Sequence, residues 1–243
     1  MVVKSKVKYI ASLGQKKQRD EDGLFVAEGP KVVAELIQSA PENIRDIYAV
    51  KDWVKENDGA GRVPVTEVTE EELGKISQLK TPNQVLAVVR KFDTGEQIPV
   101  KGKISLVLDT LQDPGNLGTI IRIADWFGIE QIICSPDCAD VYNPKVVQST
   151  MGSIARVKVF YTDLAEWLPV QKDIRIYAAA LEGKDITNMN PLKEGLIIIG
   201  NESKGIEEEI LALANERITI PKKGKAESLN AGVAAGIILS HLV

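Results

Sequence analysis

Short apolar runs alternate with helical segments through the second half of the chain, and this alternation constrains the fold more than any other feature. Runs such as SLVLD (105–109), IEQIIC (129–134) and GLIIIG (195–200) carry apolar side chains on both faces of the expected strand. Strands of this kind, separated by helices, are typical of a parallel sheet that is covered by helices on both sides. The alternation therefore predicts an α/β domain over residues 104–243.

A smaller α/β domain is expected over residues 1–95. Its segment KVVAELIQS (31–39) has the apolar spacing of a helix, and VLAVVR (85–90) has the composition of a buried strand. Thr69 is expected to begin a further helix through a capping box. The polar stretch 96–103, which contains a proline and a glycine, interrupts the periodic pattern and is interpreted as a linker.

The composition excludes several classes of chemistry. His241 is the single histidine among the 243 residues, so most histidine-based acid–base mechanisms are excluded. Cys134 and Cys138 lack further ligands at matched spacing, and we expect reduced thiols and no metal site. The start of the chain lacks an apolar signal core, and no window approaches about 18 uninterrupted apolar residues. These features favour a cytoplasmic protein that does not enter a membrane.

Positive charge is concentrated at two places, although the net charge of the chain is −4. A negative net charge counts mildly against nucleic-acid binding, which usually needs a basic surface. Yet no acidic residue precedes Asp20, and the stretch before it holds Lys4, Lys6, Lys8, Lys16, Lys17 and Arg19. A second basic run lies at 222–225. Each run is either a nucleic-acid contact or an ordinary solvated surface, and charge alone leaves both interpretations open.

Three loops of the second half could carry chemistry, because ligands bind beyond the carboxyl ends of the strands in parallel sheets. The first loop (109–118) turns tightly on proline and glycine and leads into a helix that carries Arg122. The second loop (200–205) places Glu202 before a helix. The third, near the C-terminus, places Ser228 where the N-cap of the last helix is expected. Taken singly, the three residues could equally be a surface arginine, a helix-stabilising carboxylate and a cap.

In this order, the three loops resemble the motifs of the SpoU (TrmH-like) RNA ribose methyltransferases, a branch of the SPOUT superfamily. The matching positions are Asn116, Gly118 and Arg122 in the first motif, Gly200, Asn201, Glu202 and Gly205 in the second, and Ile220, Pro221, Gly224, Ser228, Leu229 and Asn230 in the third. The resemblance covers about residues 104–242. Residues 9–36 are in turn similar to the L30e-like substrate-binding domain that precedes the catalytic domain in many relatives, which favours RNA as the substrate.

The resemblance implies a fold, a cofactor and an assembly. The parallel-sheet domain would contain a deep trefoil knot, and S-adenosylmethionine would serve as the cofactor without any metal. Two copies would form a homodimer with sites where the knots meet. The reaction would be 2′-O-methylation of a ribose in RNA, with ribosomal RNA favoured over transfer RNA.

The resemblance also implies roles for individual residues. The catalytic group would consist of Asn116, Arg122, Glu202, Ser228 and Asn230. The cofactor would be held, largely through backbone groups, at Ala180, Gly200, Ile220 and Leu229. The expected RNA contacts are the basic residues Lys16, Lys17, Arg19 and Lys31.

Arg122 is the residue whose role is least obvious. A free arginine has a pKa above about 12, so we favour Arg122 as a group that binds phosphate and stabilises alkoxide charge rather than as a base. Two other functions are considered, an RNA-binding dimer without turnover and a doubly wound dehydrogenase. The complete set of motif residues argues against the first, and the absence of a GxGxxG fingerprint argues against the second.

Overall fold

The computed structural model describes residues 3–57 and 63–243, which form two compact units. Unit 1 comprises Met1–Asp93 and Asp140–Arg156, and unit 2 comprises Thr94–Ala139 and Val157–Val243. The consecutive domains expected from the sequence differ from these units in two respects: residues 140–156 pack with the N-terminal part of the chain, and the expected linker 96–103 belongs to unit 2.

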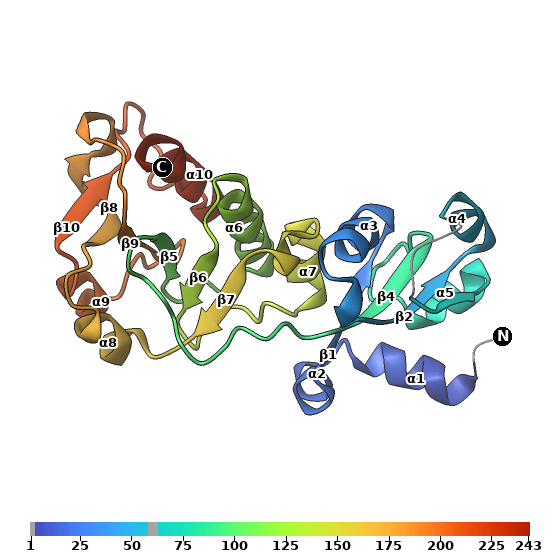
Figure 1. The fold of residues 1–243 in the computed structure, drawn as a ribbon. Helices are drawn as coiled ribbons and strands as arrows, with labels where there is room; N and C mark the ends of the chain where they lie inside the picture. Colours follow the sequence, from blue (N-terminus) through green and yellow to red (C-terminus); the bar gives the residue numbers. More distant parts are fainter. Residues whose placement is uncertain (1–2, 58–62) are drawn as a thin grey trace. The chain divides into compact units, whose positions relative to one another are not determined.

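A four-stranded mixed sheet forms the centre of unit 1 (Figure 1). Its strands are β1 (Leu24–Glu28), β2 (Ile44–Ala49), β3 (Val65–Glu67) and β4 (Val85–Arg90). In the order β1-β4-β2-β3, β4 runs antiparallel to β1 and β2, and β3 runs parallel to β2. The buried strand predicted at 85–90 is therefore confirmed as β4.

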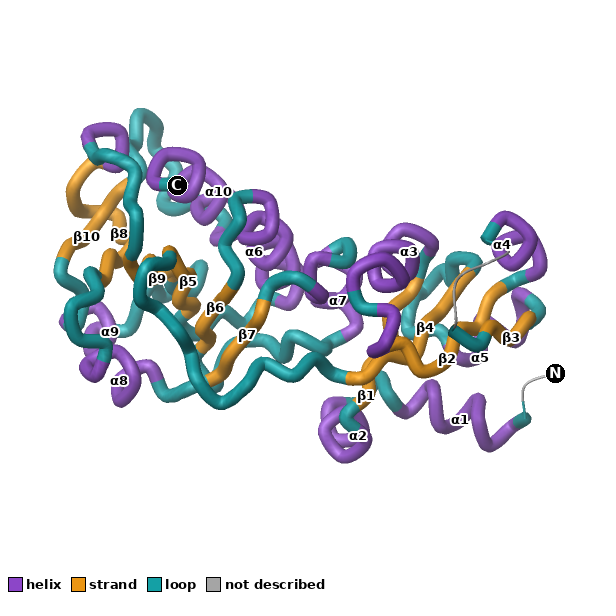
Figure 2. Tube along the Cα trace, viewed as in Figure 1, coloured by secondary structure: helices purple, strands orange, loops and turns teal. Residues whose placement is uncertain are grey.

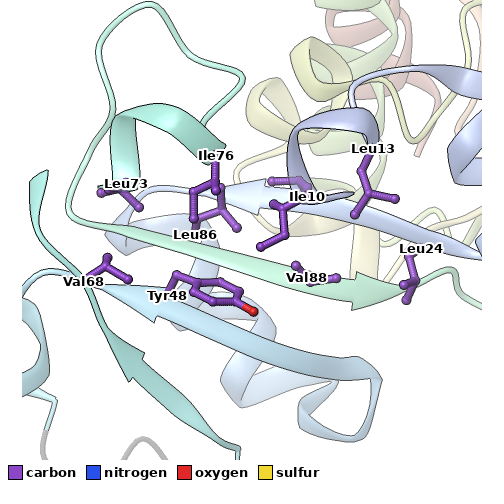
Figure 3. Packing of buried hydrophobic residues seen from close by; sticks show 10 residues of the cluster. Ile10, Leu13, Leu24, Tyr48, Val68, Leu73, Ile76, Leu86 and Val88 are labelled. Atoms are coloured by element: carbon purple, nitrogen blue, oxygen red, sulfur yellow. The ribbon is translucent and has the colours of Figure 1, made fainter. Parts of the chain in front are cut away.

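Helices cover both faces of this sheet. On one face, α1 (Lys4–Ser12) and α5 (Glu70–Ile76) contribute Ile10 and Leu73 to a core cluster with Tyr48 of β2 (Figure 3). On the other face, α3 (Pro30–Ser39) packs against β1 and β4 (Figure 1). The short elements are α2 (Lys16–Asp22), η1 (Pro41–Asn43) and α4 (Lys51–Glu56). The capping box at the start of α5 is present, because the Thr69 side chain accepts from the Glu72 amide and the Glu72 carboxylate accepts from the Thr69 amide.

Residues 140–156 join unit 1 through side chains that are distant in the sequence. This segment contains α7 (Pro144–Thr150), which packs against β1, and η2 (Ser153–Ala155). The ring centroids of Tyr142 and Phe25 lie 4.8 Å apart. The Arg19 guanidinium lies 2.5 Å from the Asp140 carboxylate, and Arg156 lies 2.8 Å from Glu35. Because of these contacts, residues 140–156 belong to unit 1, although the residues on both sides of them in the sequence belong to unit 2.

Unit 2 is built on a six-stranded sheet in which every neighbouring pair is parallel, as predicted (Figure 1). The strands are β5 (Ile104–Leu108), β6 (Gln131–Cys134), β7 (Lys158–Tyr161), β8 (Ile176–Asp185), β9 (Gly195–Ile199) and β10 (Glu216–Thr219), in the order β10-β8-β9-β5-β6-β7. The chain proceeds from β5 toward β7 on one side and places β8 to β10 on the other, so the strand order reverses between β5 and β9. In sheets of this kind, such a reversal opens a crevice beyond the carboxyl ends of the two strands.

Helices pack on both faces of the second sheet. The long helices α6 (Pro114–Trp126) and α10 (Ala231–Leu242) lie side by side on one face (Figures 1 and 2). The opposite face carries α8 (Leu164–Trp167) and α9 (Glu208–Ala212), with the short η3 (Leu168–Val170), in one apolar cluster with β5, β6 and β9. A further short helix, η4 (Ile186–Asn188), follows β8. The predicted linker 96–103 contains neither helix nor strand (Figure 2), but its Val100 is buried in this cluster.

One strand pair departs from regular pairing. Along β8 and β10, Arg217 pairs with Ala178, but the next residue, Ile218, pairs with Lys184. The backbone of residues 179–183 therefore leaves the ladder and forms an arc at the carboxyl end of the sheet. Among the described residues, no helix is long and apolar enough to cross a membrane.

Candidate active site

The loops after β5 and β9 meet where the strand order reverses, and hydrogen bonds of Asp109 connect them. Asp109 directly follows β5 and is only 2% exposed. Its backbone N–H donates to the Ile199 carbonyl at 2.9 Å, and its carboxylate accepts from the Glu207 N–H at 2.8 Å. The Asn201 amide donates to the Thr110 carbonyl at 2.9 Å. These hydrogen bonds fix the position of the first motif loop against the second.

The loop after β9 is a tight turn that requires glycine at its base. Asn201 and Gly205 exchange two backbone hydrogen bonds of 2.9 Å. A Cβ atom at Gly200 would lie 2.3 Å from the carbonyl carbon of Gly205, which no side chain could tolerate without displacing the backbone. The Asn201 side chain also accepts from the Ser203 and Lys204 amides. Glu202 is therefore presented from a fixed turn.

Three polar side chains, one from each motif, form a hydrogen-bonded chain. The Asn116 amide group donates to the Glu202 carboxylate, and the Asn230 amide group donates to the Asn116 oxygen at 2.8 Å. Asn116 is positioned in the first turn of α6, where its backbone N–H donates to the N-cap residue Asp113. The structure thus brings together three of the five residues expected to be catalytic.

Ser228 is not among them, and the expectation that it caps the last helix is wrong. The N-cap of α10 is Asn230, whose side chain accepts from the Gly232 and Val233 amides at 3.0 and 3.2 Å. Ser228 is exposed and makes no hydrogen bond to any residue that the structure describes. Asn230 therefore has two roles, because it begins the helix with its oxygen and reaches Asn116 with its amide group.

Arg122 also lies outside the hydrogen-bonded chain. It is six residues beyond Asn116 on α6, which corresponds to about 9 Å along the helix axis. Its side chain is exposed and has no hydrogen-bonding or ionic partner within the described part of the chain. One turn further along the same helix, Trp126 is 85% exposed. The guanidinium is therefore available to a molecule outside this chain.

The expected cofactor positions line the carboxyl ends of β8, β9 and β10. Ala180 lies in the arc that leaves the β8–β10 ladder, and Ile220 follows β10; both are half-buried. Leu229 is 45% exposed, in a loop (221–230) whose residues are all exposed. Half-buried apolar groups, backbone free of strand pairing and the close approach of backbone at Gly200 suit a ligand with an apolar body and a few polar atoms. These residues therefore fit an adenosyl cofactor.

A second layer of contacts, which the sequence did not indicate, supports the first motif loop. Thr110 adopts a positive φ of 52°, and its N–H donates to the Ser135 hydroxyl at 2.8 Å. The Leu111 N–H donates to the Cys138 sulfur at 3.2 Å. Hydrogen bonding from Cys134, more than any other contact, lowers the pKa of Cys138 to about 7, although burial opposes this effect. These contacts could not be predicted from the sequence, because Ser135 and Cys138 lie 25 and 27 positions from the residues that they hold.

Of the four basic residues expected to contact RNA, one is a structural residue. Lys16, Lys17 and Lys31 are exposed, and Lys17 has only a loose ion pair of 3.8 Å with Glu21. Arg19, in contrast, is 2% exposed and donates to the carbonyls of residues 13 and 14 as well as to Asp140. Its guanidinium is committed to unit 1, so the expectation of an RNA contact at Arg19 is withdrawn.

Metal ligands do not gather in the described part of either unit. Across residues 3–57 and 63–243, no group of three or more His, Cys, Asp or Glu side chains could hold a metal ion. Both cysteines are buried free thiols.

Both halves of the chain match known protein families. Residues 103–240 match the SpoU rRNA Methylase family, and residues 4–87 match an MRM3-like substrate binding domain. The chain is 30% identical over 240 residues to the 23S rRNA (guanosine(2553)-2′-O)-methyltransferase RlmP of Bacillus subtilis, an alignment that covers 98% of this chain and 95% of the relative.

Solved structures resemble this chain over nearly its whole length. A putative RNA methyltransferase of the TrmH family from Porphyromonas gingivalis has a TM-score of 0.87 and 33% identity, covering 99% of this chain and 98% of the other. An rRNA methyltransferase from Sinorhizobium meliloti with bound AdoMet has a TM-score of 0.84 and 30% identity, covering 99% and 95%.

Proposed function

The chain belongs to the SpoU rRNA methylase family, and we propose that it transfers a methyl group from S-adenosylmethionine to a ribose 2′-hydroxyl of ribosomal RNA. The observation that carries this proposal is the chain of hydrogen bonds from Asn230 through Asn116 to Glu202. It joins all three motif loops beyond the carboxyl ends of β5 and β9, where the strand order reverses, which is the expected place for a ligand in such a sheet.

The residues divide into those that hold the cofactor and those that act on the hydroxyl. Ala180, Gly200, Ile220 and Leu229 would hold S-adenosylmethionine, which supplies an electrophilic methyl group. Asn116, fixed between Glu202 and Asn230, can orient the attacking ribose without changing its own charge. These side chains determine where the 2′-oxygen lies relative to the methyl group.

Arg122 acts as a fixed positive charge in this mechanism. Its guanidinium carries five N–H donors and no acceptor, so it donates hydrogen bonds to a backbone phosphate and stabilises negative charge on the 2′-oxygen as the hydroxyl proton passes to water. The exposure of Arg122 and its lack of a partner within the described part of the chain are consistent with a role toward RNA.

The active assembly is a homodimer. Trp126 on α6 and Val233 on α10 are 85% and 51% exposed, and these two helices pack together, so they offer apolar surface for a second copy. Arg122 lies one helical turn from Trp126 and outside the hydrogen-bonded chain of its own protomer. In the dimer, each copy supplies Arg122 to the site of the other. The parallel-sheet domain of each copy also forms the expected trefoil knot at the cofactor site.

Ribosomal RNA is the favoured substrate because unit 1 contains the match to a substrate-binding domain. The exposed Lys16, Lys17 and Lys31 provide sequence-independent phosphate contacts. Relatives named for 23S rRNA include enzymes for a guanosine and for a uridine, so the target base differs among similar chains. We place the reaction in the cytoplasm, where bacterial ribosomal RNA is found.

A reconstituted reaction tests the function directly. Purified protein, labelled S-adenosylmethionine and unmodified 23S rRNA should give label in RNA, and mapping of 2′-O-methyl groups should locate it at one nucleotide. A transfer RNA mixture serves as the control substrate and should remain unlabelled. Calorimetry should show binding of S-adenosylmethionine and none of NAD. Binding of NAD without binding of S-adenosylmethionine would contradict the proposal.

A further inference from the structure

Unit 1 contains a pocket that none of the expected RNA contacts lines. The pocket has a volume of about 300 Å³ and lies between α1 and β2, with Lys6, Tyr9, Arg45, Asp46, Tyr48 and Val88 in its wall. Lys16 and Lys17 lie on α2, and Lys31 lies on α3. The pocket is therefore a separate feature of the same unit.

The hydroxyl of Tyr48 is buried here without a hydrogen-bonding partner. Tyr48 is 1% exposed, and no residue within 3–57 or 63–243 accepts a hydrogen bond from its hydroxyl; the charged group that approaches it is the Lys6 ammonium, whose pKa this contact raises. In Figure 3 the ring lies in the apolar cluster, and its hydroxyl points away from Val68 and toward the end of the cluster where Val88 lies. Because an unsatisfied buried hydroxyl destabilises a fold, a group that enters the pocket and accepts this hydrogen bond would explain it.

Two cations at the pocket are only loosely paired. The Lys6 ammonium and the Arg45 guanidinium each lie 3.6 Å from the Asp46 carboxylate, beyond ordinary hydrogen-bond length. Their side chains are 46% and 48% exposed. The Lys6 ammonium also lies 5.2 Å from the centroid of the Tyr48 ring, so charge and hydroxyl are close together. Two positive charges facing one carboxylate leave a net positive pocket.

The start of α1 adds donors of the same kind. Ser5 in its first turn also lines the pocket, and no side chain caps this helix end or places an acid in its first turn. Unpaired N–H groups at a helix N-terminus favour an anion. Every polar side chain that lines the pocket except Asp46 therefore carries an N–H or O–H donor for a negative charge.

We propose that this pocket binds a backbone phosphate of the RNA substrate, with Lys6 and Arg45 providing charge and the Tyr48 hydroxyl donating a hydrogen bond. The inference rests on the proposed function, because it names a second point at which the same RNA is held. Contacts of this kind position the RNA and carry no sequence information. Asp46 keeps the two cations in place when RNA is absent and weakens the binding of the phosphate.

Substitutions that affect stability and RNA affinity in opposite directions test the pocket. In the full chain, Tyr48→Phe removes only the unpartnered hydroxyl. It should lower the affinity for 23S rRNA roughly tenfold, the effect of losing a hydrogen bond to a charged group, while the melting temperature stays the same or rises. Asp46→Asn should raise the affinity, since it removes the carboxylate that lines the pocket. Binding of S-adenosylmethionine should be unchanged in both variants.

A matched control separates the pocket from general surface charge. Lys8 is exposed on α1 and does not line the pocket. Lys6→Ala should weaken binding more than Lys8→Ala and reduce the slope of log affinity against log salt by about 0.7 to 0.9. Unchanged affinity in both Tyr48→Phe and Asp46→Asn would overturn the proposal, as would equal losses for Lys6→Ala and Lys8→Ala. Absence of methyl transfer by the unaltered protein would instead overturn the proposed function, because the binding comparison does not require turnover.

Discussion

At the scale of single residues, Arg122 shows how an exposed side chain can be central to a reaction. Its guanidinium has no partner within the described residues, and its own hydrogen-bonded chain of Asn116, Glu202 and Asn230 is complete without it. A cation that is free in the isolated chain retains its full capacity for an incoming phosphate and for charge that develops during methyl transfer.

Substitution of Arg122 should therefore affect turnover and leave cofactor binding intact. Arg122→Ala is expected to lower the rate of methyl transfer by about 10²–10³, a typical effect of losing one donor to a developing charge. Arg122→Lys keeps the charge but loses the planar fork, so it should recover only part of the rate. Single-turnover kinetics with calorimetry of S-adenosylmethionine binding would measure both. Near-normal turnover of Arg122→Ala would remove the residue from the mechanism.

Glu28 gives the stability of unit 1 a dependence on pH. Its side chain is 5% exposed and accepts hydrogen bonds from the Ser77 hydroxyl and the Gln78 N–H. Burial raises the pKa of Glu28, and those two hydrogen bonds only partly oppose it. A raised carboxyl pKa means that the folded state holds the proton more tightly, so this contribution to stability is present at low pH and is lost as the pH rises through the folded pKa.

Glu28→Gln should remove this dependence. We expect the free energy of unfolding of the unaltered protein, relative to that of the variant, to decrease as the pH rises from the ordinary glutamate pKa toward neutrality. Urea unfolding over that pH series measures the difference. Two parallel curves would contradict the assignment.

Single residues also show where inference from sequence ends. The sequence predicts RNA contacts at Lys16, Lys17 and Arg19 alike, but Arg19 is buried, and Asp140, 121 positions away, accepts its hydrogen bond. Likewise, Ser228 and Asn230 are both good N-cap residues, but Asn230 is the one that caps the helix and also finds a partner in Asn116, 114 positions away. The local pattern of residues in a sequence cannot reveal a hydrogen-bonding partner that only the folded chain brings close.

At the scale of elements, the turn after β9 has the strictest steric requirement. Gly200→Ala would place a Cβ atom 2.3 Å from the Gly205 carbonyl carbon, so the turn must shift. We expect loss of S-adenosylmethionine affinity by at least about tenfold and destabilisation of about 1–3 kcal/mol. Gly74→Ala, in α5 of unit 1, is the control, because its Cβ would meet only the Pro82 side chain at 3.9 Å, an ordinary contact. Calorimetry and urea unfolding that gave equal effects for the two variants would show that close approach at Gly200 does not matter.

The sequence predicted these elements well where their periodicity was strong. The apolar runs of β5, β6 and β9 indicated a parallel sheet, and every pairing in it is parallel. The arc at 179–183 could not be predicted, because a change of pairing register between β8 and β10 depends on two strands at once. Similarly, Asp109 was placed at the end of a strand, but its bond to Glu207 joins two loops that are 98 residues apart.

At the scale of the whole molecule, a single substitution in α6 can test the proposed dimer. Trp126→Glu places a charge in the exposed apolar surface of α6 and should change the sedimentation mass from that of two chains to that of one 26.5 kDa chain. Activity should fall with it, because Arg122 would no longer reach a second site. Val170→Glu is the control, since Val170 is 64% exposed in η3, away from α6 and α10. A monomeric mass for the unaltered, active protein would contradict the dimer.

The division into units makes a prediction about truncation. Deletion of residues 1–93 would leave 140–156 without the sheet on which α7 packs, and Val146 and Val147 would lose their cover. The truncated protein should aggregate. A variant that also replaces 140–156 with a flexible linker of equal length should remain folded and bind S-adenosylmethionine. Equal solubility of the two truncated proteins would show that α7 does not need unit 1.

The return of residues 140–156 to unit 1 also affects how the chain folds during its own synthesis. When residue 93 leaves the ribosome, Phe25 and Arg19 still lack Tyr142 and Asp140. The nascent unit must wait until residue 156 has been added, which at roughly 5–20 residues per second takes several seconds. During that interval, the first strands of unit 2 emerge before unit 1 is complete. Unit 1 therefore stays incomplete while β5 and β6 emerge, and the part of β1 that α7 covers remains exposed until residue 156 has followed.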